Sequence, residues 1–224
     1  MYFSKKLLLL PFLAIFFASC LDSTQPDQDN QLVLSLELTD INDEIVSGED
    51  TVNIAQLRFL YGETNLRNSS DTLVINENIL QVSHQFSNNE LKGLARGTFE
   101  SDEIFNRLIF EIKKAEQSDT GQGSNFNEDA FIEGDSENQR YSMIINGAYN
   151  GNEFTYKSTR NFDFEFIIQD DSNGTAGSLL YSLPIKANVT SWFVNETNDG
   201  LLDPRVPDNA IGINENIQQS FSLN

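Results

Sequence analysis

The amino-acid sequence predicts an all-β protein, an antiparallel β-sandwich with a short C-terminal helix. Three observations lead to this fold class. Apolar residues recur at every second position in several segments, which is the period of a strand with one buried face. Apolar residues that lie three and four positions apart, as on one face of a helix, stand out only near the C-terminus. An Asn-Gly dipeptide joins two alternating segments, as in a tight β-hairpin.

The first strand is predicted at Leu32 to Leu38, where leucine stands at every second position. A second strand is predicted at residues 52–61. Its apolar phase changes after Ile54, which predicts a β-bulge near Ala55 and Gln56. The same alternation predicts four further strands, through Leu80, Val82, His84 and Phe86; Leu108, Phe110 and Ile112; Phe162, Phe164, Phe166 and Ile168; and Leu183, Ile185, Ala187 and Val189.

A β-hairpin is predicted around Asn150-Gly151, which separates alternating segments at residues 141–145 and 154–156. Both turn residues tolerate the positive φ angles that a two-residue hairpin turn requires.

The predicted helix follows Asp208, whose side chain is suited to an N-terminal cap. Its apolar face carries Ala210, Ile213, Ile217 and Phe221 at spacings of three and four residues. We expect this helix to pack on the sandwich or to close one of its ends.

A long acidic loop is predicted at residues 115–139, which hold seven acidic side chains and no basic one. Apart from Phe126 and residues 130–132, the segment offers little apolar surface to bury. The loop separates two halves, which form either the two sheets of one sandwich or two small domains. One β-sandwich domain at 31–224 is favoured, because neither half offers an obvious core of its own.

The composition excludes several functions. The 224 residues include 34 acidic and 14 basic side chains, one cysteine and one histidine, for a formal charge of -20. Nucleic-acid binding depends on Lys and Arg neutralising phosphates, so no nucleic-acid partner is expected. A single Cys forms neither an internal disulfide nor a Cys-rich zinc site. The lone His84 lies in phase with apolar neighbours, which favours a structural position in a strand over a general base.

Residues 1–19 have the pattern of a signal peptide: Lys5 and Lys6 precede an apolar run from Leu7 to Ala18, which Ser19 follows. That run is shorter than the roughly 20 apolar residues that span a bilayer. The sequence Phe17-Ala18-Ser19-Cys20 resembles the lipobox of bacterial lipoproteins, with Phe17 at the position where Leu is usual.

The lipobox resemblance implies cleavage before Cys20, lipidation of its sulfur, and lipid anchoring to the outer membrane, with the periplasmic or the surface face left open. Two or more acyl chains give stable attachment. The alternative is an ordinary secretory signal in which Cys20 has no special role. Residues 20–30, polar and acidic, are expected to form a flexible tether.

The mature part resembles uncharacterised secreted lipoproteins with a transthyretin-like or immunoglobulin-like β-domain. The resemblance lies in the order of structural segments, such as Leu36 to Asp40, Thr51 to Gly62 and Gly93 to Ile112. It implies a β-sandwich. Those proteins have no settled function, so the resemblance transfers no catalytic residue.

A calcium site is the one metal centre that the sequence suggests. The segment around Gly200 offers side-chain oxygen ligands spaced as in the first half of a calcium-binding loop. These ligands are Asn195, Thr197, Asp199 and Asp203. The pattern lacks the glutamate that would complete such a loop. The alternative is a glycine-containing turn after a strand. Calcium is therefore the only cofactor considered, and no catalytic residue is assigned.

The sequence favours a non-catalytic binding or accessory protein of the cell envelope, with a protein or a glycan as its partner. One alternative is a hydrolase acting on extracellular glycans through paired carboxylates, because 34 acidic residues allow such a pair without nominating it. A second alternative is a structural or adhesive surface protein, which would present an exposed strand edge or an apolar patch.

Overall fold

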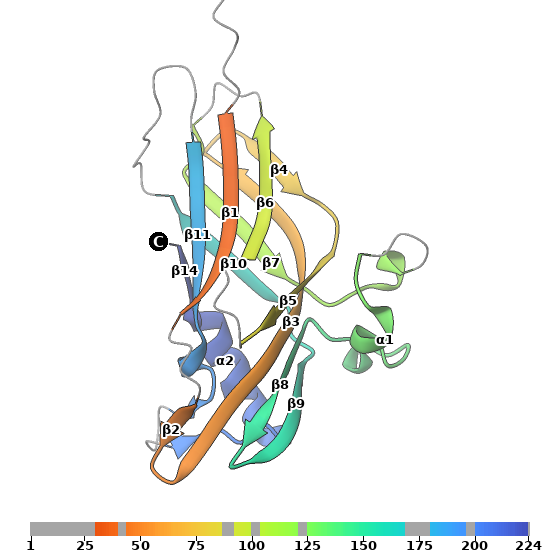
Figure 1. Ribbon diagram of the computed structural model, residues 1–224. Helices are drawn as coiled ribbons and strands as arrows, with labels where there is room; N and C mark the ends of the chain where they lie inside the picture. Colours follow the sequence, from red (N-terminus) through yellow and green to blue (C-terminus); the bar gives the residue numbers. More distant parts are fainter. Residues whose placement is uncertain are drawn as a thin grey trace, which may run out of the picture.

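The computed structural model describes residues 30–39, 44–86, 92–99, 104–120, 125–168, 180–195 and 200–223. It confirms the predicted all-β sandwich with one C-terminal helix (Figure 1). No helix within these ranges is long and apolar enough to cross a membrane.

The smaller of the two main sheets, sheet A, has four strands in the order β14-β11-β1-β6. These strands are β1 (Asn30–Thr39), β6 (Lys92–Phe99), β11 (Leu180–Asn188) and β14 (Phe221–Leu223). Strand β1 pairs with β6 in antiparallel fashion. Its pairing with β11 is parallel, from Gln31 opposite Leu180 to Thr39 opposite Asn188. The first strand of the domain is therefore a central strand of sheet A, and it is hydrogen-bonded to one of the last strands in the sequence.

The larger sheet, sheet B, is built on β3 (Asp50–Arg67), a strand of 18 residues. Strand β3 pairs directly with five antiparallel strands, and two more extend the sheet beyond them. The other strands of sheet B are β2 (Ile45–Ser47), β4 (Thr72–Asn76), β5 (Leu80–Gln85), β7 (Arg107–Ile112), β8 (Met143–Tyr149), β9 (Asn152–Ser158) and β10 (Phe162–Ile167). The register between β3 and β8 shifts between Ile54 and Gln56, which confirms the predicted bulge.

The main hydrophobic core lies between the sheets, where alternate residues of facing strands meet. Leu34 of β1, Phe59 of β3 and Ile185 of β11 are fully buried in it. Its aromatic centre is formed by Phe110 of β7, whose ring stacks on Phe164 of β10 at a centroid distance of 4.8 Å.

The predicted hairpin joins β8 and β9, and the structure confirms it. Tyr149 lies opposite Asn152, so the turn contains only two residues. These residues, Asn150 and Gly151, have φ angles of 49° and 74°, as a type I′ turn requires.

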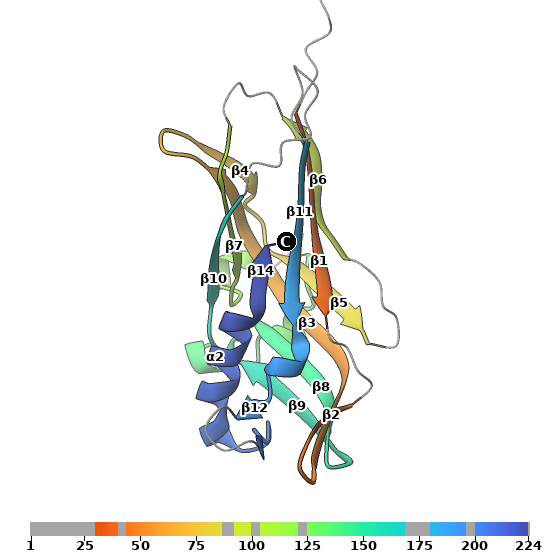
Figure 2. The ribbon, with the colours of Figure 1, turned by 90° about the vertical axis from the view of Figure 1, so that its left-hand side faces the viewer.

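The C-terminal helix α2 (Ala210–Ser220) buries Ile213 and Ile217, as predicted. Figure 2 shows it beside β9, where Tyr156 donates a hydrogen bond of 2.8 Å to the side chain of Asn214. The helix therefore covers the part of sheet B that extends below sheet A in Figure 2.

Both predicted ends of this helix are corrected by one position. Asp208 is not the cap, because Pro207 begins a 3₁₀ turn (Pro207–Asn209) and Asn209 takes the N-cap position. Phe221 is not helical, because the backbone becomes extended there and Phe221 pairs with Ala187 as the first residue of β14.

Most of the acidic segment 115–139 lies on the outer face of sheet B. It contains two 3₁₀ turns (Gln117–Asp119 and Glu137–Gln139) and the short helix α1 (Glu128–Phe131). Phe131 is fully buried in a second apolar cluster with Leu60 of β3 and Ile144 of β8. These two strand residues point away from the main core because neighbouring side chains of a strand face opposite sides.

Candidate functional site

Three of the predicted site residues, Cys20, Thr197 and Asp199, lie outside the described residues. Asn195 ends the short strand β12 (Val194–Asn195), opposite Gly200 of β13 (Gly200–Leu201). The backbone around the predicted calcium segment is thus a small antiparallel ladder.

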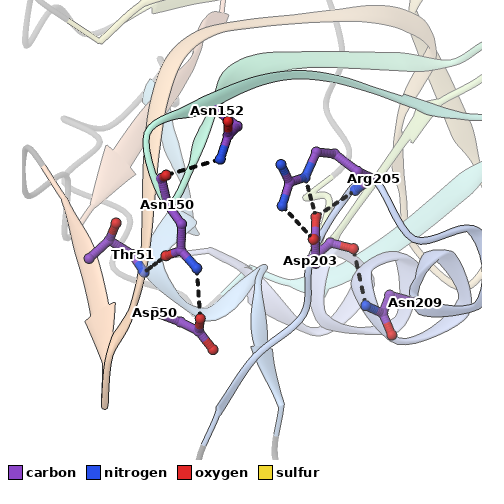
Figure 3. A network of polar contacts seen from close by, with 7 residues as sticks. All are labelled: Asp50, Thr51, Asn150, Asn152, Asp203, Arg205 and Asn209. Carbon is purple, nitrogen blue, oxygen red and sulfur yellow. Dashed lines mark hydrogen bonds and ion pairs between the residues drawn. The ribbon is translucent and has the colours of Figure 1, made fainter.

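Asp203 lies in a polar network beside the helix α2 (Figure 3). Its Oδ1 accepts hydrogen bonds of 2.9 Å from the backbone nitrogen and from Nε of Arg205, and its Oδ2 accepts one of 2.7 Å from Nη2. These hydrogen bonds from Arg205 lower the pKa of the Asp203 carboxyl. The charge of Asp203 is therefore already compensated, and a cation would have to displace Arg205.

Calcium binding at this segment stays a prediction, and thermal unfolding of the full chain tests it. Within the described residues, no three His, Cys, Asp or Glu side chains gather as a metal site requires. If Thr197 and Asp199 complete a site, millimolar calcium is expected to raise the melting midpoint, because a ligand of the folded state stabilises it by mass action. An Asp199→Asn variant should lose this rise. An unchanged midpoint in calcium and in chelator contradicts the site.

The rest of the network in Figure 3 joins the β8–β9 turn to the start of β3. Asn150 Oδ1 accepts a hydrogen bond of 2.7 Å from the backbone nitrogen of Thr51, and its Nδ2 donates one of 2.8 Å to Asp50. The guanidinium of Arg205 lies 5.2 Å from the ring centre of Tyr149. Burial, followed by the Asp50 carboxylate, raises the pKa of Tyr149. These contacts fix neighbouring turns, so we assign them a structural role.

His84 is buried within β5, and its ring contacts that of Phe86 edge-on at 4.9 Å. A general base must reach its substrate, and this imidazole is covered by the core. The position agrees with the structural interpretation of the strand pattern.

A polar cleft of about 460 Å³ opens where the two ends of the acidic segment 115–139 meet. Its walls come from the chain that follows β7, from the 3₁₀ turn Glu137–Gln139 and from the link between β9 and β10. The lining residues are Lys114, Ala115, Glu116, Ser118, Glu137, Arg140 and Asn161.

Hydrogen bonds hold the backbone and the cations of this cleft in place. The backbone nitrogen of Lys114 donates to Asn161 Oδ1 at 2.9 Å, and its Nζ lies 3.4 Å from Glu137 Oε2. Arg140 Nη2 donates to the backbone oxygen of Asp135 at 3.2 Å. The Nε of Arg140 is buried, and no group of the described residues accepts its hydrogen bond. A buried guanidinium nitrogen without an acceptor is uncommon, because leaving such a donor unpaired costs free energy.

A triad of side chains next to the cleft, Glu133, Tyr141 and Lys157, connects the acidic segment to sheet B. Tyr141 donates a hydrogen bond of 2.6 Å to Glu133 Oε2, and Lys157 of β9 forms an ion pair with Glu133 Oε1. Hydrogen bonds from Lys157 and Tyr141 lower the pKa of Glu133, and the bond to Glu133 together with burial raises the pKa of Tyr141 to about 12. The triad keeps Arg140, next to Tyr141 in the chain, at a fixed place in the cleft wall.

Sequence reasoning missed this cleft because its residues belong to no motif. One signal was present: Lys114 and Arg140 immediately flank a segment of seven acidic residues that contains no base. In a chain with few cations, two of them at the ends of one acidic segment indicate a place where charges of both signs can meet.

Comparisons with protein-family models, with curated proteins and with solved structures found no match for this chain.

Proposed function

We propose that this protein is a non-catalytic, lipid-anchored binding protein of the bacterial cell envelope, and that the cleft lined by Lys114 and Arg140 holds its ligand. The observation that carries the binding role is the side chain of Arg140, which lines an open cleft and whose buried Nε makes no hydrogen bond within the described chain. The Phe17 to Cys20 sequence supports the anchoring. Outer-membrane attachment follows from that anchoring as part of the proposal.

Binding is favoured over glycan hydrolysis by the surroundings of the cleft carboxylates. Glu116 and Glu137 both line the cleft, and paired carboxylates are what a glycosidase needs. The general acid of such an enzyme is kept protonated by apolar surroundings. Glu137 instead has a side chain that is 86% exposed, with its carboxylate near Lys114 Nζ. If the protein hydrolysed any of a panel of glycosides, and if Glu116→Gln abolished this activity, glycan hydrolysis would be favoured over binding.

Replacement of Cys20 by alanine tests the lipid anchor. In a gram-negative host, the wild-type chain is expected to incorporate radiolabelled fatty acid and to sediment with membranes. Cys20→Ala should carry no label, and its soluble fraction should rise about tenfold or more, because the acyl chains supply the membrane affinity.

Ser23→Ala, a change in the predicted tether, is the matched control and should behave like the wild type. Equal membrane retention of Cys20→Ala and wild type, with no label in either chain, would show that the N-terminus acts as an ordinary secretory signal.

A further inference from the structure

The cleft has a balanced charge in a strongly acidic protein. The whole chain carries 34 acidic and 14 basic side chains, whereas the cleft has Lys114 and Arg140 against Glu116 and Glu137. A single negative charge on a ligand can be paired there with one cation. A dianion such as phosphate or sulfate is disfavoured, because both cleft carboxylates repel it.

The geometry of Arg140 suits a carboxylate. Its Nη2 is held by the backbone oxygen of Asp135, and its Nε has no acceptor among the described residues. If the Arg140 side chain turns toward the cleft, a carboxylate oxygen can reach Nε and satisfy this buried donor with a charge-assisted hydrogen bond. The planar guanidinium fork matches the two oxygens of a carboxylate better than an ammonium group does.

The other lining groups are suited to hydroxyls. Ser118 and Asn161 provide a hydroxyl and an amide, and Glu116 and Glu137 provide strong acceptors. Among the described lining residues, only Ala115 is apolar. A peptide would be recognised through apolar pockets or along a strand edge, so this lining favours a small, highly hydroxylated ligand. A volume of about 460 Å³ is within the usual range for small-molecule sites.

We propose that the cleft binds a carboxylated saccharide, with the carboxylate on Arg140 and the sugar hydroxyls on Glu116, Glu137 and Ser118. This inference rests on the proposed binding function and names its ligand class. The carboxylate can belong to a uronic acid or to the lactyl group of an amino sugar, which present the same chemistry to Arg140.

The test is a titration of the full chain in detergent micelles, followed by calorimetry and by the NMR signal of Arg140 Nε. The probes are galacturonic acid, N-acetylmuramic acid, neutral galactose and inorganic phosphate. At least one of the two carboxylated probes is expected to bind and to shift the Nε signal, and which one does so identifies the source. Galactose should bind at least about tenfold more weakly than galacturonic acid, because a hydrogen bond to a charged group is lost.

Arg140→Gln should weaken binding of the active probe about tenfold or more, and Arg140→Lys should weaken it less because the charge remains. Ser118→Ala is a second test that should leave the fold intact, because it removes only one hydroxyl from the cleft wall. It should weaken binding of the active probe about twofold to tenfold. Arg107→Gln is the matched control. Arg107 pairs with Glu165 at the other end of β7, so its loss should leave binding unchanged.

The possible failures are distinct. If galactose or phosphate shifts the Arg140 signal more than either carboxylated probe, the cleft is a binding site and the ligand class is wrong. If no probe shifts it, the inference is overturned. The lipid anchor is then judged separately by the Cys20→Ala experiment.

Discussion

Replacing Phe110 with alanine is expected to lower the free energy of unfolding by about 3–5 kcal/mol. Phe110 is fully buried in β7. Its ring contacts those of Tyr61, Phe164, Phe166 and Phe221, which belong to β3, β10 and β14. Alanine would leave a cavity where both sheets meet, and the surrounding rings can fill it only in part. Urea unfolding followed by tryptophan fluorescence measures the loss, since Trp192 is also buried in the main core.

Ile167→Ala is the matched control for this cavity, because the Ile167 side chain is 75% exposed at the end of β10. A change within about 0.5 kcal/mol is expected for it, as for most surface positions. Similar losses for the two variants would mean that Phe110 does not occupy the centre of the core.

Replacing Gly147 with alanine is expected to destabilise the protein by roughly 1–3 kcal/mol. Gly147 lies in β8 opposite Ile54, next to the bulge of β3. An added Cβ would overlap the backbone oxygen of Asn53 and would lie 2.9 Å from Cζ of Phe154. The Asn53 oxygen belongs to a strand that is paired on both sides, so it cannot move away without disturbing the sheet. Chemical denaturation of the variant measures the cost.

Gly97→Ala is the matched control for crowding. Gly97 lies in β6, and its added Cβ would meet no atom within 4 Å. Its stability should change little or rise slightly, because alanine restricts the unfolded chain more than glycine does. If Gly147→Ala proved as neutral as Gly97→Ala, the close approach of β3 and β8 would be disproved.

Local patterns predicted the strands because each strand has one buried face. Leu32, Leu34 and Leu36 are buried and fulfil the alternation, and the change of phase after Ile54 located the bulge. The parallel partner of β1 was not predictable in this way. Alternation says which face of a strand is buried but not which distant strand lies beside it, so the pairing of Leu34 with Leu183 depends on the tertiary fold.

The cleft could not be predicted for a related reason. Lys114, Arg140 and Asn161 come from three separate links, and none of them belongs to a recognisable motif in its own segment. What brings the acidic segment back to sheet B is the burial of Phe131 against Leu60 and Ile144. Those two strand residues are out of phase with the main core, so the second apolar face of β3 and β8 was the overlooked signal. Asn150 was predicted only as a turn residue, and its side-chain bonds to Thr51 and Asp50 depend on the same packing.

The parallel pairing of β1 with β11 also determines the order in which the domain can fold. Gln31 and Leu180 are partners although 149 positions separate them, so sheet A cannot be completed until nearly the whole chain has been synthesised. Contacts this distant in sequence slow folding, because the chain must close a long loop before it gains their stabilisation. The edge of β1 that pairs with β11 therefore has no partner strand until the last part of the chain is available, although β6 can pair with the other edge earlier. We expect refolding from denaturant to be slow compared with that of helical proteins of the same length, with the pairing of β1 and β11 formed late.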